Sequence, residues 1–102
     1  MKILTPGHRY ELNGFENPEN TQVIQFIEKV KLEAYNEYII ANDGTTTEEV
    51  LEALIDRLTH LNSKFPCREN SCAITKLEEG LMWLEKRTAD RMKRGVEGKH
   101  EK

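Results

Sequence analysis

Residues 45–64 read TTTEEVLEALIDRLTHLNSK and residues 67–95 read CRENSCAITKLEEGLMWLEKRTADRMKRG, and together they predict a helical hairpin. Threonines that can cap free amides, followed by two acids that complement the helix dipole, place the start of the first helix at residues 45–49. Apolar residues then recur at three- and four-residue spacing as far as about Lys64. They are Val50, Leu51, Leu54, Ile55, Leu58 and Leu61. Phe65-Pro66 ends this helix, because the residue before a proline disfavours helical backbone.

The second helix is predicted from about Cys67 to Arg94, with Gly95 where a left-handed C-terminal cap belongs. One apolar stripe follows it: Ile74, Leu77, Leu81, Leu84 and Thr88. At 1.5 Å per residue this helix would be roughly 40 Å long and the first only about 25 Å, so the first helix cannot cover it. Residues 81–84, Leu-Met-Trp-Leu, are also apolar on nearly all sides. We therefore expect other subunits to cover this helix.

The first 45 residues predict a small antiparallel β-meander of three strands, at His8–Leu12, Thr21–Val30 and Tyr35–Ala41. Asn13-Gly14, Asn17-Pro18 and Asn42-Asp43-Gly44 are turn-forming segments that separate or end these strands. The predicted class is α+β and oligomeric. Residues 1–45 form the small sheet and residues 46–102 the helical hairpin, in one compact structural unit.

Composition excludes several classes of protein. The chain has 102 residues and a net charge of −3, which argues against a protein that coats duplex nucleic acid. No apolar run approaches the roughly 18 residues of a membrane span, and residues 1–6 lack the apolar segment of a secretory signal. We therefore expect a cytosolic protein without a membrane partner, in which Cys67 and Cys72 stay reduced.

Motifs for catalysis, metal binding and cofactor binding are absent from the sequence. It contains no Gly-rich phosphate loop, no H-E-x-x-H and no G-x-S-x-G, so we expect no catalytic residues and no cofactor. Cys67 and Cys72 are five residues apart, a spacing that fits neither C-x₂-C nor ligation from one helix face. We expect no metal site.

The sequence from Phe65 to His100 resembles the helical-hairpin domain of phage-encoded anti-defence sponges. The resemblance rests on three segments, 65–84 (FPCRENSCAITKLEEGLMWL), 87–91 (RTADR) and 95–100 (GVEGKH). It is strong over residues 46–100 and looser before them, where HRYEL at 8–12 and QFIEK at 25–29 are similar to the front of small phage proteins that carry this hairpin. The family includes the anti-CBASS cyclic-oligonucleotide sponge and the anti-Thoeris cyclic ADP-ribose sponge.

This resemblance implies a non-enzymatic phage protein that sequesters cyclic nucleotide second messengers in the cytoplasm of the infected bacterial host. It also implies a ring-like homo-oligomer, often a hexamer. Compact anti-CBASS members begin with a short helix bearing a Tyr and a Lys that hold cyclic dinucleotides. Strands are predicted there in this chain, so those ligand positions are not carried over.

The candidate ligand residues come mainly from chemistry. Arg68, Asn70 and Ser71 lie in the first turn of the second helix, where free amides and the helix dipole favour an anion such as phosphate. The alternative is ordinary capping by Asn70 or Ser71, with Arg68 solvated. Thr75 and Lys76 lie one turn further on and extend the same surface, unless Thr75 only packs against another helix.

A second group lies near the basic C-terminal end, which carries Lys86, Arg87, Arg91, Lys93, Arg94, Lys99 and Lys102. Arg87 and Arg91 are four residues apart and share a helix face, which suits phosphate recognition by two guanidinium groups. Pairing with Glu85 and Asp90, or simple solvation, is the alternative.

Tyr10, beside His8 and Arg9, offers a ring for base stacking, but the pattern favours the alternative, a tyrosine in a core or interface. The other function that the residues allow is a protein-interaction module. In that case the stripe at residues 81–84 and the basic end would dock onto a host protein and inhibit it. A small hydrolase is the third possibility.

Overall fold

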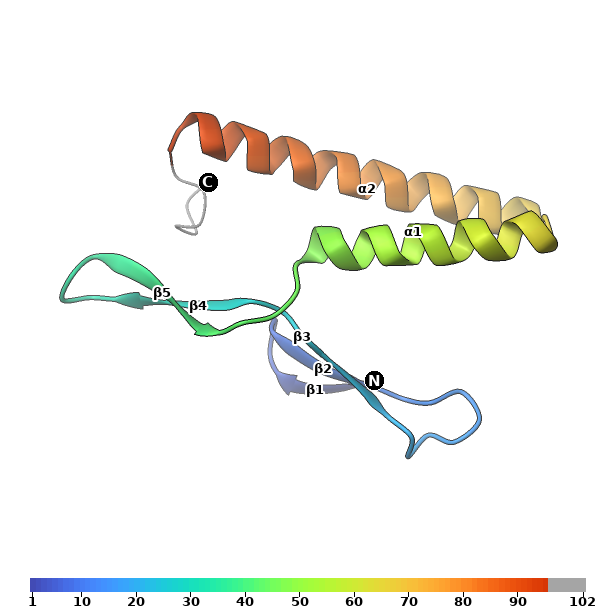
Figure 1. The fold of residues 1–102 in the computed structure, drawn as a ribbon, viewed down its shortest axis with the longest axis horizontal. Coiled ribbons are helices and arrows are strands. Elements are labelled where there is room, and N and C mark those ends of the chain that lie inside the picture. Colours follow the sequence, from blue (N-terminus) through green and yellow to red (C-terminus); the bar gives the residue numbers. More distant parts are fainter. Residues whose placement is uncertain (96–102) are drawn as a thin grey trace. The chain divides into compact units, whose positions relative to one another are not determined.

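The computed structural model describes residues 1–95 and divides into two units, Met1–Thr46 and Thr47–Lys102. The first unit contains strands and the second contains helices (Figure 1). The predicted α+β class and the predicted helical hairpin are therefore confirmed. Val96 to Lys102, which include the basic residues Lys99 and Lys102, lie outside the described residues.

Five strands form two small antiparallel sheets in the first unit. They are β1 (Lys2–Thr5), β2 (Arg9–Leu12), β3 (Gln22–Gln25), β4 (Glu28–Leu32) and β5 (Glu37–Asn42). One sheet has the order β1-β2-β3 and the other pairs β4 with β5. The prediction of three strands in one meander is wrong in number: β1 was not predicted, and the run Thr21–Val30 contains two strands of different sheets.

The break between β3 and β4 falls at Phe26 and Ile27, where the backbone changes partners. The Phe26 amide donates to the His8 carbonyl at 2.7 Å, whereas the Ile27 amide donates to the Thr45 carbonyl at 2.9 Å. Gly44 makes this crossing possible, because a Cβ atom at residue 44 would collide with the backbone carbonyl of Gln25. The glycine that the sequence predicts as a turn residue therefore permits a close backbone approach.

The turn between β4 and β5 explains a smaller error in the third predicted strand. Its amide–carbonyl bond runs from Tyr35 to Leu32 at 3.1 Å. Asn36 has a φ of 51°, a left-handed conformation that asparagine tolerates better than most residues. Tyr35 and Asn36 thus belong to the turn, and β5 begins at Glu37 rather than at Tyr35.

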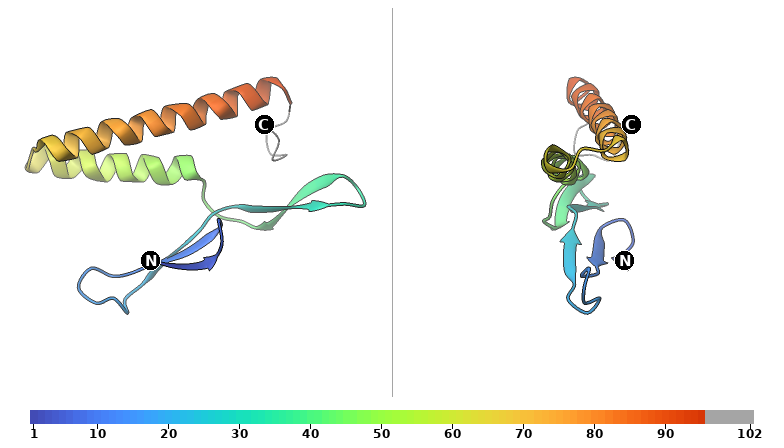
Figure 2. Two further views of the ribbon diagram at one scale, coloured as in Figure 1. Left: turned by 180° about the vertical axis from the view of Figure 1, so that it is seen from behind. Right: turned by 90° about the vertical axis from the view of Figure 1, so that its right-hand side faces the viewer.

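The helices are α1 (Thr47–Lys64) and α2 (Arg68–Lys93), which run side by side in opposite directions (Figures 1 and 2). Their bounds confirm the predicted hairpin, including its end before Pro66. Gly95 follows the C-cap with a φ of 70°, as the sequence predicts, and its amide donates to the Met92 carbonyl at 3.1 Å. By residue count α1 is about 27 Å long and α2 about 39 Å.

The two helices meet along a seam of half-buried residues with the three- and four-residue spacing of a coiled coil. On α1 these seam residues are Glu48, Leu51, Ile55, Leu58 and Asn62. On α2 they are Asn70, Ile74, Leu77, Leu81, Leu84, Thr88 and Arg91, which include the whole predicted stripe. The stripe predicted on α1 is wider than this contact, because Leu54 and Leu61 are 42% and 37% exposed.

The hairpin leaves much of its apolar surface in solvent. Among residues 1–95 no hydrophobic residue is buried, and the side chain of Trp83 is 63% exposed. Met82 beside it is 56% exposed. The two helices of one chain therefore do not enclose a hydrophobic core. This agrees with the sequence, which predicts that the first helix cannot cover the second. Within the same residues, neither helix combines the length and the apolar character that a bilayer crossing requires.

Candidate functional site

The start of α2 is fixed by Asn62 and Cys67 rather than by the predicted caps. Cys67 is the N-cap, and its Sγ accepts from the Asn70 amide at 3.4 Å. Asn62, near the end of α1, accepts from the Cys67 amide at 3.0 Å and donates to the Ser71 hydroxyl at 3.1 Å. Sequence reasoning missed Asn62. The signal that could have identified Asn62 was its position, because it is a polar residue at the seam position that follows Leu58.

The predicted ligand residues of this first turn therefore differ in availability. Arg68 is the exposed first residue of α2, and within residues 1–95 its guanidinium has no hydrogen-bond or ion-pair partner. The Ser71 hydroxyl is engaged by Asn62, and the Thr75 hydroxyl donates to the Ser71 carbonyl at 3.1 Å. Lys76 pairs with Glu79 at 3.6 Å, with both side chains largely exposed. Among these predicted ligand residues, Arg68 is consequently the cation that has no partner in the described part of the chain.

At the other end of α2, Arg87 contacts the first turn of α1. Its Nη2 lies 3.8 Å from Glu48 Oε1, so the pair links the two helices. Asp90 pairs with Lys86 at 3.1 Å, not with the arginine that the sequence suggested. Arg91 is a half-buried seam residue. Arg87 is thus the more exposed of the two predicted guanidinium groups.

The structure does not bring these two groups together in one chain. Arg68 and Arg87 are separated by nineteen residues of continuous helix, or about 28 Å along its axis. A single small cyclic nucleotide cannot contact both within one hairpin. If both groups hold one ligand, they must come from different copies of the chain.

Tyr10 lies in β2 of the first unit, opposite Ile24 of β3. Its ring packs edge-to-face against Phe26, with centroids 6.0 Å apart and planes at 81°. Tyr10 is half-buried in this aromatic pair. One part of its ring is therefore already used for packing, which matches the structural alternative raised by the sequence.

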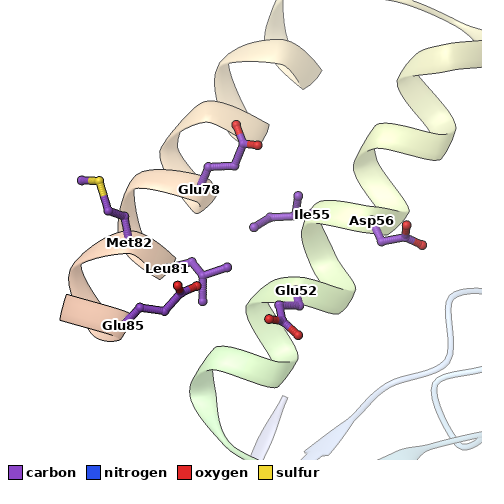
Figure 3. A pocket seen from close by; sticks show the side chains of 7 residues that line it. All are labelled: Glu52, Ile55, Asp56, Glu78, Leu81, Met82 and Glu85. Carbon is purple, nitrogen blue, oxygen red and sulfur yellow. The ribbon is translucent and has the colours of Figure 1, made fainter. Parts of the chain in front are cut away.

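A groove runs along one side of the hairpin, with a volume of about 430 Å³. Ile55 of α1 and Leu81 of α2 point toward each other at its centre, and Met82 lies at its outer rim (Figure 3). Its charged lining consists of carboxylates: Glu52, Asp56, Glu78 and Glu85. The sequence places these acids on helix surfaces but does not show that they share one groove. We call it the acidic groove.

Comparison with known families shows which family this hairpin belongs to. A family model described as "Acb2/Tad1, hairpin domain" matches residues 27–89, which is more than half of the chain. The chain belongs to this family. The match begins at Ile27, so the family region includes β4 and β5 together with α1 and most of α2.

A relative is also similar over more than half of the chain. It is "Thoeris anti-defense 1" of Bacillus phage SBSphiJ7, which is 59% identical over 61 residues. The aligned segment is 59% of this chain and 43% of that protein, so the chain matches less than half of the relative's length. The predicted resemblance to the phage anti-defence sponge family is thereby confirmed. Most predicted site residues of this Acb2/Tad1 hairpin lie in the matched region, whereas Tyr10 and Arg91 lie outside it.

Proposed function

We propose that this chain is a phage anti-defence protein that binds cyclic nucleotide immune signals and sequesters them without cleavage. The observation that carries the proposal is the 59% identity to Thoeris anti-defense 1 over 61 residues. The expected ligands are cyclic oligonucleotides or cyclic ADP-ribose isomers, which all carry phosphate. The expected location is the cytoplasm of the infected bacterium.

The start of α2 has the chemistry that a phosphate requires. A helix opens with N–H groups that lack partners within the helix, and its dipole favours an anion there. Cys67 takes the amides of Asn70 and Ser71, which leaves those of Arg68 and Glu69 for a ligand or solvent. Arg68 adds an exposed guanidinium that can donate two parallel hydrogen bonds to phosphate oxygens.

The proposal includes assembly into a homo-oligomer larger than a dimer, with a hexamer expected. The support is the apolar surface that a single hairpin leaves exposed, above all Trp83 and Met82.

Replacing Arg68 with alanine is expected to weaken ligand binding by about 10- to 150-fold. This range corresponds to the loss of about 1.5–3 kcal/mol for hydrogen bonds to a charged group. Stability should change by no more than about 0.5 kcal/mol, because Arg68 is exposed. Calorimetry with a cyclic dinucleotide, a cyclic trinucleotide and a cyclic ADP-ribose isomer, at two salt concentrations, measures the effect.

The matched control is Glu69→Gln, which removes a negative charge from the same helical turn. It should leave phosphate binding equal or tighter, whereas Arg68→Ala weakens it. Binding to the wild type should also weaken as salt rises, because the interaction is between charges. Equal affinities of wild type and Arg68→Ala for every ligand that binds would remove Arg68 from the site.

A further inference from the structure

The acidic groove concentrates negative charge without a positive partner. Among residues 1–95, no ion pair with Lys, Arg or His involves the carboxylates of Glu52, Asp56, Glu78 or Glu85. All four residues are exposed, and they share the groove with the apolar residues Ile55 and Leu81. A cationic surface with apolar residues among its charges would complement it.

The opposite side of the same hairpin has that composition. The groove residues apart from Ile55 and Leu81 each come directly after a seam residue in the sequence. For example, Asp56 comes after Ile55, and Glu78 comes after Leu77. Residues that immediately precede a seam residue lie on the opposite flank, because successive helix residues are about 100° apart. On that flank, from Leu54 to Leu61 and from Ala73 to Arg87, the residues are Leu54, Arg57, Leu61, Ala73, Lys76, Gly80, Trp83 and Arg87. We call this stretch the basic side, since between these bounds it carries three cations and no carboxylate, whereas Glu69 and Asp90 precede the seam residues just beyond its two ends on α2.

The basic side is also built for close approach. Gly80 lies in the middle of α2, where glycine costs about 1 kcal/mol relative to alanine. A Cβ atom at this position would meet nothing within 4 Å, so packing within the hairpin does not require glycine. Trp83 beside it is 63% exposed and offers an aromatic anchor. The ion pairs of Lys76 and Arg87 have N–O distances of 3.6 and 3.8 Å, and the side chains of both cations are exposed, so these pairs contribute little and leave the cations available to a partner.

We propose that the acidic groove of one copy receives the basic side of the next copy, in a head-to-tail contact. Unlike a two-fold contact, such an interface uses two different surfaces of each chain, and it generates a ring when the rotation closes. The partner is fixed by charge: four carboxylates of one hairpin meet Arg57, Lys76 and Arg87 of another. This inference rests on the assembly included in the proposed function and specifies which surfaces make it.

Charge reversal tests the contact directly. An all-basic variant carries Asp56→Lys with Glu78→Lys, and an all-acidic variant carries Arg57→Glu with Lys76→Glu. Each variant alone should self-associate at least about tenfold more weakly than the wild type, because like charges then face each other. An equimolar mixture should recover the wild-type mass in light scattering, since every contact again joins opposite charges. Glu16→Lys with Glu19→Lys, on the exposed loop before β3, is the control with the same change in net charge as the all-basic variant.

The outcomes separate this inference from the proposed function. If the all-basic variant assembles as the wild type does, or if the mixture stays dissociated while both variants keep their helical circular dichroism, the head-to-tail contact is overturned. In either case the wild type would still be assembled and able to bind signals, so the proposed function would stand. A wild type that is monodisperse at 11.9 kDa would instead contradict the proposed assembly, and this contact with it.

Discussion

Trp83→Asp is expected to dissociate the assembly while leaving the hairpin folded. Trp83 is 63% exposed in the single chain and does not belong to the α1–α2 seam, so the hairpin itself loses little. In an assembly the indole would be covered, and aspartate there would be an unpaired charge in an apolar contact. The expected loss of association energy is about 2–4 kcal/mol, or about 30- to 1,000-fold in the dissociation constant.

Light scattering at micromolar concentration measures this effect. The wild type should be larger than a dimer, and Trp83→Asp should approach the mass of one chain. Cys72→Asp is the matched control, because Cys72 is an exposed residue of the same helix and is not on the basic side. If Trp83→Asp keeps the wild-type mass, the indole faces solvent in the assembly as well.

Leu77→Asp is expected to unfold the hairpin rather than dissociate it. Leu77 is a half-buried seam residue of α2, and the two helices have few other apolar contacts to replace it. Placing a carboxylate there should cost about 3–5 kcal/mol, which combines lost burial with the cost of a charge in an apolar contact. The measurement is the loss of helical circular dichroism on heating, with Cys72→Asp as the exposed control. A melting curve equal to that of the wild type would mean that the seam does not hold the hairpin together.

The helices were predictable because their signals are local. Apolar spacing, the acids at residues 48 and 49, Pro66 and Gly95 each act within a turn or two of helix. The observed bounds, Thr47–Lys64 and Arg68–Lys93, follow from these signals. The cap itself was not predicted: the sequence offered capping by Asn70 or Ser71 only as an alternative, and Cys67, the observed N-cap, is a poor N-cap by sequence preference. Asn62 fixes the turn from the preceding helix, which is a contact between elements.

The strands were less predictable because strand patterns show which residues alternate, not which strand is the neighbour. Thr21–Val30 is predicted as one strand with apolar residues on both faces, yet its hydrogen-bond partner changes from β2 to the segment at Thr45. That change depends on the close approach at Gly44, nineteen residues after Gln25. β1 is four residues long with a bulge in its ladder, too short for a clear periodic signal.

The candidate site also has some features that local sequence signals predict and others that depend on contacts between helices. Arg68 at a helix start is a local signal, and the structure places it there with its side chain exposed. The 28 Å between Arg68 and Arg87 also follows from the helix length, once the helix is known to be continuous. The acidic groove and the basic side could not be separated by sequence alone. They depend on which residues of α1 meet which residues of α2, and Glu52 and Glu78 are twenty-six residues apart in the chain.

The central claim is that the protein binds a cyclic nucleotide and returns it unchanged, and one measurement tests it most directly. Pure protein is incubated with a panel of cyclic dinucleotides, cyclic trinucleotides and cyclic ADP-ribose isomers, separated from free ligand, and then denatured. Chromatography identifies what is released. We predict that at least one ligand is depleted from solution by the folded protein and recovered intact after denaturation. A cleaved product would indicate an enzyme, and no depletion of any ligand would contradict the claim and favour direct docking onto a host protein.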